Sequence, residues 1–187
     1  MTSWPFDPLV PLRYGAIIAD PPWAYEMRSE KGYGKSPEAH YETMSEEEIA
    51  ALPVGYLASR DCLLVLWSTW PHLPVALRIT AAWGFTYKTG GPWVKRTASG
   101  AAAFGPGYIL RTATEPFLVG TMGRPIYRSR SVRNLIDSAR REHSRKPPEM
   151  REMVERLLPS VPACELFARE PWPGHAVWGR ETGKFAA

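Results

Sequence analysis

Short apolar runs alternate with helical segments along this chain of 187 residues, and this alternation constrains the fold more than any other feature. Each run is short, apolar or alternating, and bounded by polar or turn-forming residues, which is typical of strands. The predicted strands are Tyr14–Ala19, Cys62–Trp67, Thr86–Lys95 with a break at Gly90–Gly91, Pro116–Gly120, Cys164–Ala168 and Ala176–Trp178.

Three segments between these runs carry helix signals. Residues 45–48 read Ser-Glu-Glu-Glu, a capping box, so a helix is expected to begin there and end near Leu52. Leu73–Trp83 has helical spacing and stops at Gly84, and residues 147–158 begin with proline and carry an apolar stripe. Strands that alternate with helices predict a single α/β domain over the whole chain, with a mainly parallel sheet flanked by helices.

Composition excludes several classes of protein. The net charge of +4 is a mild basic excess, which permits nucleic-acid binding without requiring it. Cys62 and Cys164 each lie in an apolar run, so buried thiols are expected rather than a disulfide or a metal site. The four histidines show no metal-ligand spacing. No apolar stretch reaches membrane length and no leader pattern begins the chain, so we expect a cytoplasmic protein without a metal or a membrane partner.

The first predicted strand runs directly into Asp20-Pro21-Pro22-Trp23. Ligands of open α/β sheets bind beyond the carboxyl ends of the strands, which is where Asp20 lies. The prolines fix φ and remove two backbone donors, so the carboxylate and a nearby carbonyl form an acceptor pair suited to an exocyclic NH₂ group. Trp23 is large enough to stack on a base. The alternative is a Pro-Pro turn with Asp20 as a cap and Trp23 in the core, and the motif alone leaves both open.

Residues 124–146 form a basic stretch with eight Lys or Arg and only two acidic residues. Such a stretch is usually a solvated loop. It is also typical of a segment that contacts nucleic-acid phosphates, and this interpretation is favoured if a base has to be presented to Asp20. The candidate phosphate contacts are Arg128, Arg130, Arg133, Arg140, Arg141 and Arg145.

Nine segments, in this order and spacing, resemble the MT-A70 family of S-adenosylmethionine-dependent N6-adenine methyltransferases over nearly the whole chain. They are ADPPW (19–23), YETMSEEEIAALPV (41–54), LVLWST (64–69), AAWGF (81–85), WVK (93–95), EPFLVG (115–120), HSRKPPEM (143–150), MVERLLP (153–159) and ELFAR (165–169). The short bacterial and phage members are the most similar. The resemblance implies a Rossmann-like fold in permuted order, with the catalytic strand first and the cofactor strand last, and S-adenosylmethionine as cofactor.

The resemblance also implies roles for particular residues. The catalytic motif is Asp20, Pro21, Pro22 and Trp23, in which Asp20 and the Pro21 carbonyl bind the target amine and Asp20 borders the cofactor. Tyr41 and Glu115 match positions near the substrate. Lys95 follows a strand and is either a further substrate contact or a solvated strand end.

The cofactor positions implied by the resemblance lie late in the chain. Lys146 matches a lysine that contacts the cofactor. The segment around the ribose and adenine is matched by Glu165, Leu166, Phe167 and Arg169. Glu181 fits a ribose-binding position, whereas Arg180 stands where the family usually has Asn, and His175 where it usually has Trp.

We therefore expect an enzyme that methylates the N6 amine of adenine in nucleic acid, DNA rather than RNA. The base is flipped out of a duplex or taken from a single strand. Two alternatives stay open: an RNA N6-adenine methyltransferase, and a catalytically inactive nucleic-acid-binding subunit of such an enzyme. The intact Asp-Pro-Pro-Trp motif disfavours the inactive subunit. A homodimer or a partner subunit also stays open.

Overall fold

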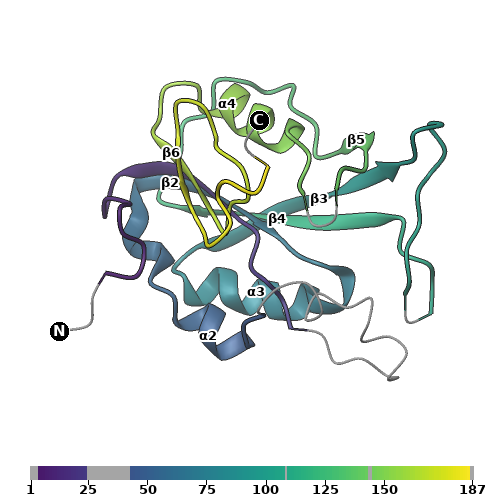
Figure 1. The fold of residues 1–187 in the computed structure, drawn as a ribbon. Helices are drawn as coiled ribbons and strands as arrows, with labels where there is room; N and C mark the ends of the chain where they lie inside the picture. Colours follow the sequence, from purple (N-terminus) through teal and green to yellow (C-terminus); the bar gives the residue numbers. More distant parts are fainter. Residues whose placement is uncertain (1–3, 25–42, 108, 143–144, 186–187) are drawn as a thin grey trace.

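The computed structural model describes residues 4–24, 43–107, 109–142 and 145–185 of the chain. They form a seven-stranded sheet in the order β5-β3-β4-β2-β1-β6-β7 (Figure 1). The strands are β1 (Tyr14–Ala19), β2 (Ala58–Trp67), β3 (Thr86–Arg96), β4 (Thr114–Met122), β5 (Ile136–Ala139), β6 (Ala163–Leu166) and β7 (Ala176–Trp178). The α-helices are α2 (Glu46–Ala51), α3 (Leu73–Ala82) and α4 (Glu149–Leu157), and the 3₁₀ turns are Val54–Leu57 and Trp70–His72.

The sheet is mainly parallel, as the sequence predicts. β1 pairs in parallel with β2 and β6, β6 with β7, and β3 with β5. β4 alone runs the other way, antiparallel to both β2 and β3. The carboxyl ends of β1, β2, β3 and β6 therefore meet at the edge of the sheet where β4 begins, and side chains from distant parts of the sequence come together there.

Helices cover both faces of the sheet, which confirms the expected layers (Figure 1). On one face, Ile49 of α2 and Ile79 of α3 pack with Ile17 of β1 in a buried cluster. On the other face, Met150 and Val154 of α4 pack in a second cluster. Because successive strand residues point to opposite faces, β1 supplies side chains to both clusters and is buried along its whole length.

The start of α2 follows the predicted capping box. Ser45 Oγ accepts a hydrogen bond from Glu48 N at 3.2 Å, and Glu48 Oε2 accepts one from Ser45 N at 2.7 Å. Two backbone N–H groups that have no partner within the helix are thereby satisfied. In the part of the chain that the structure describes, no helix is long and apolar enough to cross a membrane.

Several strand boundaries differ from those predicted. β2 begins at Ala58 rather than Cys62. The sequence pattern misses this start because residues 59–61 are polar and partly or fully exposed. β3 continues through Gly90 and Gly91, so the predicted break is wrong. A Cβ atom at Gly91 would clash with the backbone oxygen of Asn134, which means that this glycine allows two backbones to approach closely rather than turning the chain.

The basic stretch and the last long strand also differ from expectation. Part of the basic stretch forms β5, a four-residue strand with only one buried side chain, which leaves too weak a pattern to predict. β6 ends at Leu166 instead of Ala168. Phe167 has a φ of +62°, a left-handed conformation that stops the strand and redirects the chain.

Candidate active site

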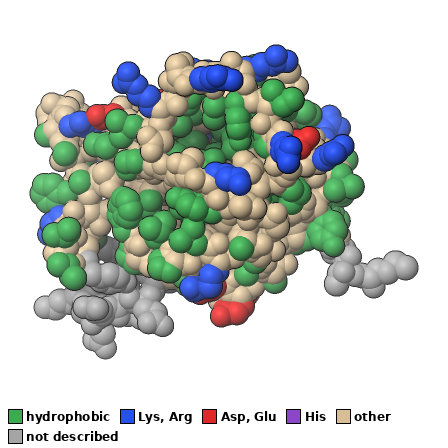
Figure 2. Space-filling view, turned by 180° about the vertical axis from the view of Figure 1, so that it is seen from behind, with side chains coloured by type: hydrophobic (Ala, Val, Ile, Leu, Met, Phe, Trp, Pro, Cys, Tyr) green, Lys and Arg blue, Asp and Glu red, His purple; other side chains and the backbone are tan. Residues whose placement is uncertain are grey.

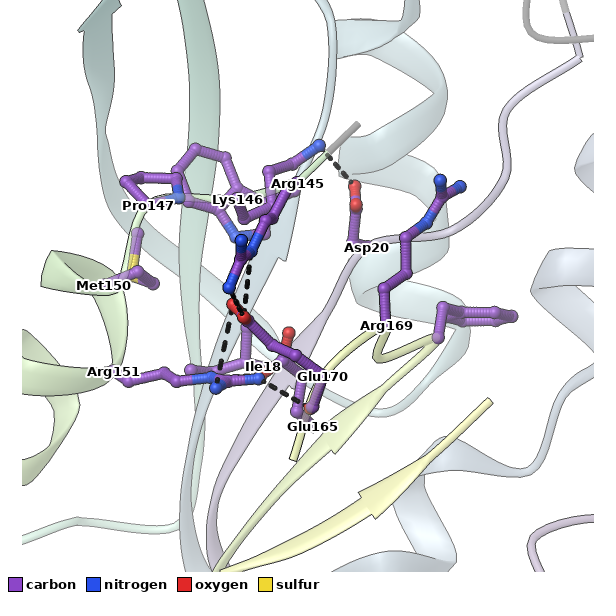
Figure 3. Close-up of a pocket in the computed structure, with 12 residues that line it drawn as sticks. Ile18, Asp20, Arg145, Lys146, Pro147, Met150, Arg151, Glu165, Arg169 and Glu170 are labelled. Atoms are coloured by element: carbon purple, nitrogen blue, oxygen red, sulfur yellow. Dashed lines mark hydrogen bonds and ion pairs between the residues drawn. The ribbon is translucent and has the colours of Figure 1, made fainter. Parts of the chain in front are cut away.

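A polar pocket opens at the carboxyl ends of β1, β2 and β6 (Figure 3). The pocket is open to solvent on one side. Its lining combines acidic, basic and apolar side chains. The lining residues are Ile18, Asp20, Trp67, Arg145, Lys146, Pro147, Met150, Arg151, Glu165, Phe167, Arg169 and Glu170. The fold thus places Asp20, Lys146 and Glu165 in one cavity, although they are distant in sequence.

A chain of alternating charges leads from Asp20 away from the pocket. Lys146 Nζ lies 2.9 Å from Asp20 Oδ1 and 2.6 Å from Glu115 Oε1, and Lys95 Nζ lies 2.7 Å from Glu115 Oε2. We call these four side chains the lysine–carboxylate chain. Its Asp20, Lys146 and Glu115 side chains are each no more than 16% exposed. Lys95 is therefore not a solvated strand end, and Glu115 reaches Asp20 through Lys146.

The lysine–carboxylate chain shifts the pKa of its members. Burial raises the pKa of Asp20 above its ordinary value, and the charge of Lys146 counters only part of that rise. Burial would raise the pKa of Glu115 too, but Lys146 and Lys95 lower it to about 2. For Lys146, burial acts to lower the pKa, but the charges of Asp20 and Glu115 raise it well above its ordinary value. Lys146 therefore stays protonated at neutral pH and favours the ionised form of Asp20.

The motif after β1 differs from the expected open platform. Trp23 is only 6% exposed and belongs to the core, where its ring stacks on His72 with the ring centroids 5.6 Å apart. The alternative that places Trp23 in the core is the one that the structure supports. The Pro21 carbonyl accepts a hydrogen bond from Trp23 N at 2.9 Å, which leaves its second lone pair for another donor. The Pro22 carbonyl accepts one from Met44 N.

The cofactor residues expected on β6 divide between the two faces of the strand. Glu165 lines the pocket and is 8% exposed. Leu166 is fully buried in the core cluster on the opposite face, and its contact with the cofactor stays a prediction. Phe167 and Arg169 line the pocket, and Phe167 is held edge-on against Trp178 at 5.5 Å between ring centroids.

Arg180 and Glu181 lie outside the pocket lining. Glu181 Oε2 is 3.5 Å from Arg169 NH1, so Glu181 is linked to the pocket through that arginine. Arg180 is exposed. His175 packs against Trp172 and lies 3.6 Å from a Glu155 oxygen. Tyr41, which we expected near the substrate, falls outside the described residues.

The arginines of the basic stretch separate into two groups. Arg141 NH1 lies 2.9 Å from Glu170 Oε1, and Arg145 NH2 lies 2.5 Å from Glu170 Oε2. These two guanidinium groups hold the wall of the pocket together, and their contact with phosphate stays a prediction. Four others are exposed: Arg128, Arg130, Arg133 and Arg140. Figure 2 shows Lys and Arg side chains along the upper rim of the molecule, with few acidic side chains near them.

Two charged residues of the pocket were not predicted. Arg151 lies on α4 and its Nε is 2.7 Å from Glu165 Oε2, while Glu170 binds the two arginines of the loop before α4. In the sequence, Arg151 looks like part of the solvated face of an amphipathic helix. Only the register of α4 against β6 reveals its partner, and no local pattern encodes that register.

Among the described residues, no group of three or more His, Cys, Asp or Glu side chains could hold a metal ion. Cys62 and Cys164 are buried free thiols, as predicted. Burial raises the pKa of both thiols well above the ordinary value, so neither is a reactive thiolate at neutral pH.

Comparison with known proteins matches this architecture to one family. The MT-A70 family model covers residues 14–181. The type II methyltransferase M.MunI from Mycoplasma sp is 31% identical over 94% of this chain and 81% of its own length. The N(6)-adenosine-methyltransferase MT-A70-like protein of Arabidopsis thaliana is 32% identical over 88% of this chain and 23% of its own. The N(6)-adenine-specific methyltransferase METTL4 of Mus musculus is 32% identical over 92% of this chain and 38% of its own length. The chain belongs to the MT-A70 family.

Proposed function

We propose that this protein transfers the methyl group of S-adenosylmethionine to the N6 amine of adenine in DNA. The observation that carries the proposal is the position of Asp20, at the carboxyl end of β1 and in one pocket with Lys146 and Glu165. DNA is preferred because the chain spans 81% of M.MunI, a type II methyltransferase. By contrast, it spans only about a quarter of the Arabidopsis N(6)-adenosine-methyltransferase relative.

The pocket residues fit S-adenosylmethionine, the methyl donor used by this family. Glu165 offers a carboxylate acceptor for the paired hydroxyls of a ribose. Lys146 and Arg169 offer cations for the carboxylate of an amino acid. Phe167 adds an aromatic surface beside them. When bound, this donor supplies an electrophilic methyl group, and all other contributions come from the side chains of the protein.

Asp20 and Pro21 would orient the target amine. An adenine amine is a poor nucleophile because its lone pair is delocalised into the ring. Hydrogen bonds from its two N–H groups to a carboxylate and a carbonyl favour the pyramidal form, whose lone pair is available for attack. Lys146 binds Asp20 through Oδ1, and no described residue hydrogen-bonds Oδ2, which can therefore accept the amine. Positioning of this kind supplies much of the barrier reduction.

Lys146 would have a second task. Burial raises the pKa of Asp20, and a protonated Asp20 would lose an acceptor that the amine needs. The positive charge of Lys146 opposes this protonation, and Glu115 with Lys95 holds Lys146 in place. The lysine–carboxylate chain would thereby keep Asp20 ionised although its side chain is largely buried.

The substrate would reach this pocket as an extruded or single-stranded base, because N6 of a paired adenine is not accessible to Asp20. The exposed arginines of the basic stretch are placed to neutralise phosphates of the strand that carries the base. Trp23, which lies in the core, would support the motif from below rather than stack on the base.

The test is methyl transfer from labelled S-adenosylmethionine to duplex DNA, single-stranded DNA and RNA of one sequence, followed by nucleoside analysis. The wild type and the exposed control Asp7→Asn are expected to produce N6-methyladenine in DNA. Asp20→Ala is expected to produce none while still binding the cofactor in calorimetry. Dominant transfer to RNA would show that RNA, and not DNA, is the substrate. A folded wild type that binds no S-adenosylmethionine would indicate an inactive subunit.

A further inference from the structure

We propose that Arg151 is a positioning residue for the cofactor, which holds the Glu165 carboxylate so that one of its oxygens faces the ribose hydroxyls. The inference rests on the proposed function, because it takes the pocket to be the S-adenosylmethionine site. Arg151 lies on α4 and Glu165 on β6, so the contact joins a helix to the strand that it covers (Figure 3).

Each nitrogen of the Arg151 guanidinium group has its own partner. Nε donates to Glu165 Oε2 at 2.7 Å, NH1 to the Pro171 carbonyl at 2.8 Å, and NH2 to the Glu170 carbonyl at 3.1 Å. The group is planar and rigid, so three hydrogen bonds define its position and its plane. Its side chain is 15% exposed and that of Glu165 is 10% exposed, so water competes little for these bonds.

The arrangement engages only one oxygen of Glu165. Arg151 binds Oε2, and no described residue donates a hydrogen bond to Oε1. A carboxylate with one oxygen fixed has its second oxygen fixed as well, since the two share a plane. Because Glu165 lines the pocket, Oε1 is the acceptor that a ribose hydroxyl would meet without reorienting the side chain.

The charge of Arg151 supports the same positioning role as its hydrogen bonds. Burial raises the pKa of Glu165, and the nearby carboxylates of Asp20 and Glu170 raise it further, whereas Arg151 lowers it. The other charged groups of the pocket wall are Lys146, Arg145 and Arg169. Lys146 binds Asp20, Arg145 binds Glu170, and Arg169 NH1 lies 3.5 Å from Glu181 Oε2. Loss of Arg151 would therefore promote protonation of Glu165, and a protonated carboxyl has less capacity to accept two hydroxyls.

The main competing explanation is that Arg151 only ties α4 to the loop after β6 through the two backbone carbonyls. The two explanations differ in how Arg151 depends on Glu165. If Arg151 acts through the carboxylate, its removal has no effect on cofactor affinity once Glu165 has been replaced. If it only supports the loop, the effects of the two replacements add.

The experiment measures the Kd of S-adenosylmethionine by calorimetry for the wild type, Arg151→Met, Glu165→Gln and the double variant, with Arg156→Met as the control on the exposed side of α4. We expect Arg151→Met to weaken binding about 10- to 100-fold at neutral pH. We expect the double variant to bind as Glu165→Gln does, and Arg156→Met to bind as the wild type does.

The pH profile gives a second readout that a purely structural tie would not move. In Arg151→Met, the loss of affinity on acidification is expected to begin at a higher pH than in the wild type, because Glu165 takes up a proton more readily. Glu165→Gln should remove this difference. If Arg151→Met fails to fold, Arg151→Lys provides the test. It keeps the charge without the planar group, so it should keep the wild-type pH profile with weaker binding.

Two results would overturn the inference while leaving the proposed function intact. One is a folded Arg151→Met protein that binds S-adenosylmethionine as tightly as the wild type. The other is a double variant whose loss of affinity is the product of the two single losses. A wild type that binds no S-adenosylmethionine would instead contradict the proposed function, so the two failures are distinguishable.

Discussion

Replacement of Glu115 by Gln is expected to remove an acid-sensitive part of the free energy of unfolding. The pKa of Glu115 lies at about 2, below its ordinary value of 4.5, because Lys146 and Lys95 outweigh the effect of burial. One pKa unit corresponds to about 1.4 kcal/mol, so ionisation of Glu115 adds about 3 kcal/mol to the free energy of unfolding. Gln resembles the protonated carboxyl in shape, so Glu115→Gln should lose about this amount at pH 7.

The pH dependence follows from the direction of the shift. A carboxyl group with a depressed pKa in the folded protein stabilises it above pH 4.5, and this stabilisation is lost as the pH falls from 4.5 to about 2. The difference between wild type and Glu115→Gln should therefore be smaller by about 1.4 kcal/mol at pH 3.5 than at pH 7. Urea unfolding monitored by tryptophan fluorescence measures both values.

The control is Glu152→Gln, which removes an exposed carboxylate from α4 and should show no comparable pH dependence. A Glu115→Gln protein as stable as the wild type at pH 7 would refute the reasoning. So would a difference that stays constant down to pH 3.5, because the contribution of Glu115 would then not depend on its charge.

Three further predictions concern the sheet, the core and the nucleic-acid surface. Gly91→Ala should lower the free energy of unfolding by about 1–3 kcal/mol in urea, because its Cβ meets the Asn134 backbone oxygen. Trp83→Phe should cost about 1–3 kcal/mol in the same assay, because the buried Ile49 carbonyl loses the hydrogen bond from Trp83 Nε1. Arg128→Gln should reduce the salt-dependence slope of DNA binding by about 1, measured by fluorescence anisotropy. Arg13→Gln, exposed just before β1, should leave that slope unchanged.

Much of the fold is encoded locally and could be predicted from the sequence. β1 is a continuous apolar run that is buried on both faces, and α2 begins at a capping box whose two hydrogen bonds are present. β5 and the first part of β2 escaped prediction because their side chains are largely exposed. Gly90 and Gly91 suggested a break, yet the structure uses them where strands and loops approach closely. A local pattern cannot separate these two uses of glycine.

The candidate site was predictable only in part. Asp20 directly follows one recognisable strand and Glu165 lies in another, so the parallel topology brings them to one edge of the sheet. Successive side chains of β6 point to opposite faces of the sheet, so Leu166, next to Glu165, lies in the core cluster on the other face. Arg151 and Glu170 could not be found in advance, because their roles depend on how α4 and the loop after β6 pack together.

The central claim is that Asp20 directs methyl transfer to adenine N6 in DNA. The most direct measurement maps N6-methyladenine in DNA from cells that express the wild type, beside cells that express Asp20→Ala at equal levels. We predict methylated adenines in a common sequence context with the wild type, and their absence with Asp20→Ala. Equal methylation in both samples, or none with a folded wild type that binds S-adenosylmethionine, would contradict the claim.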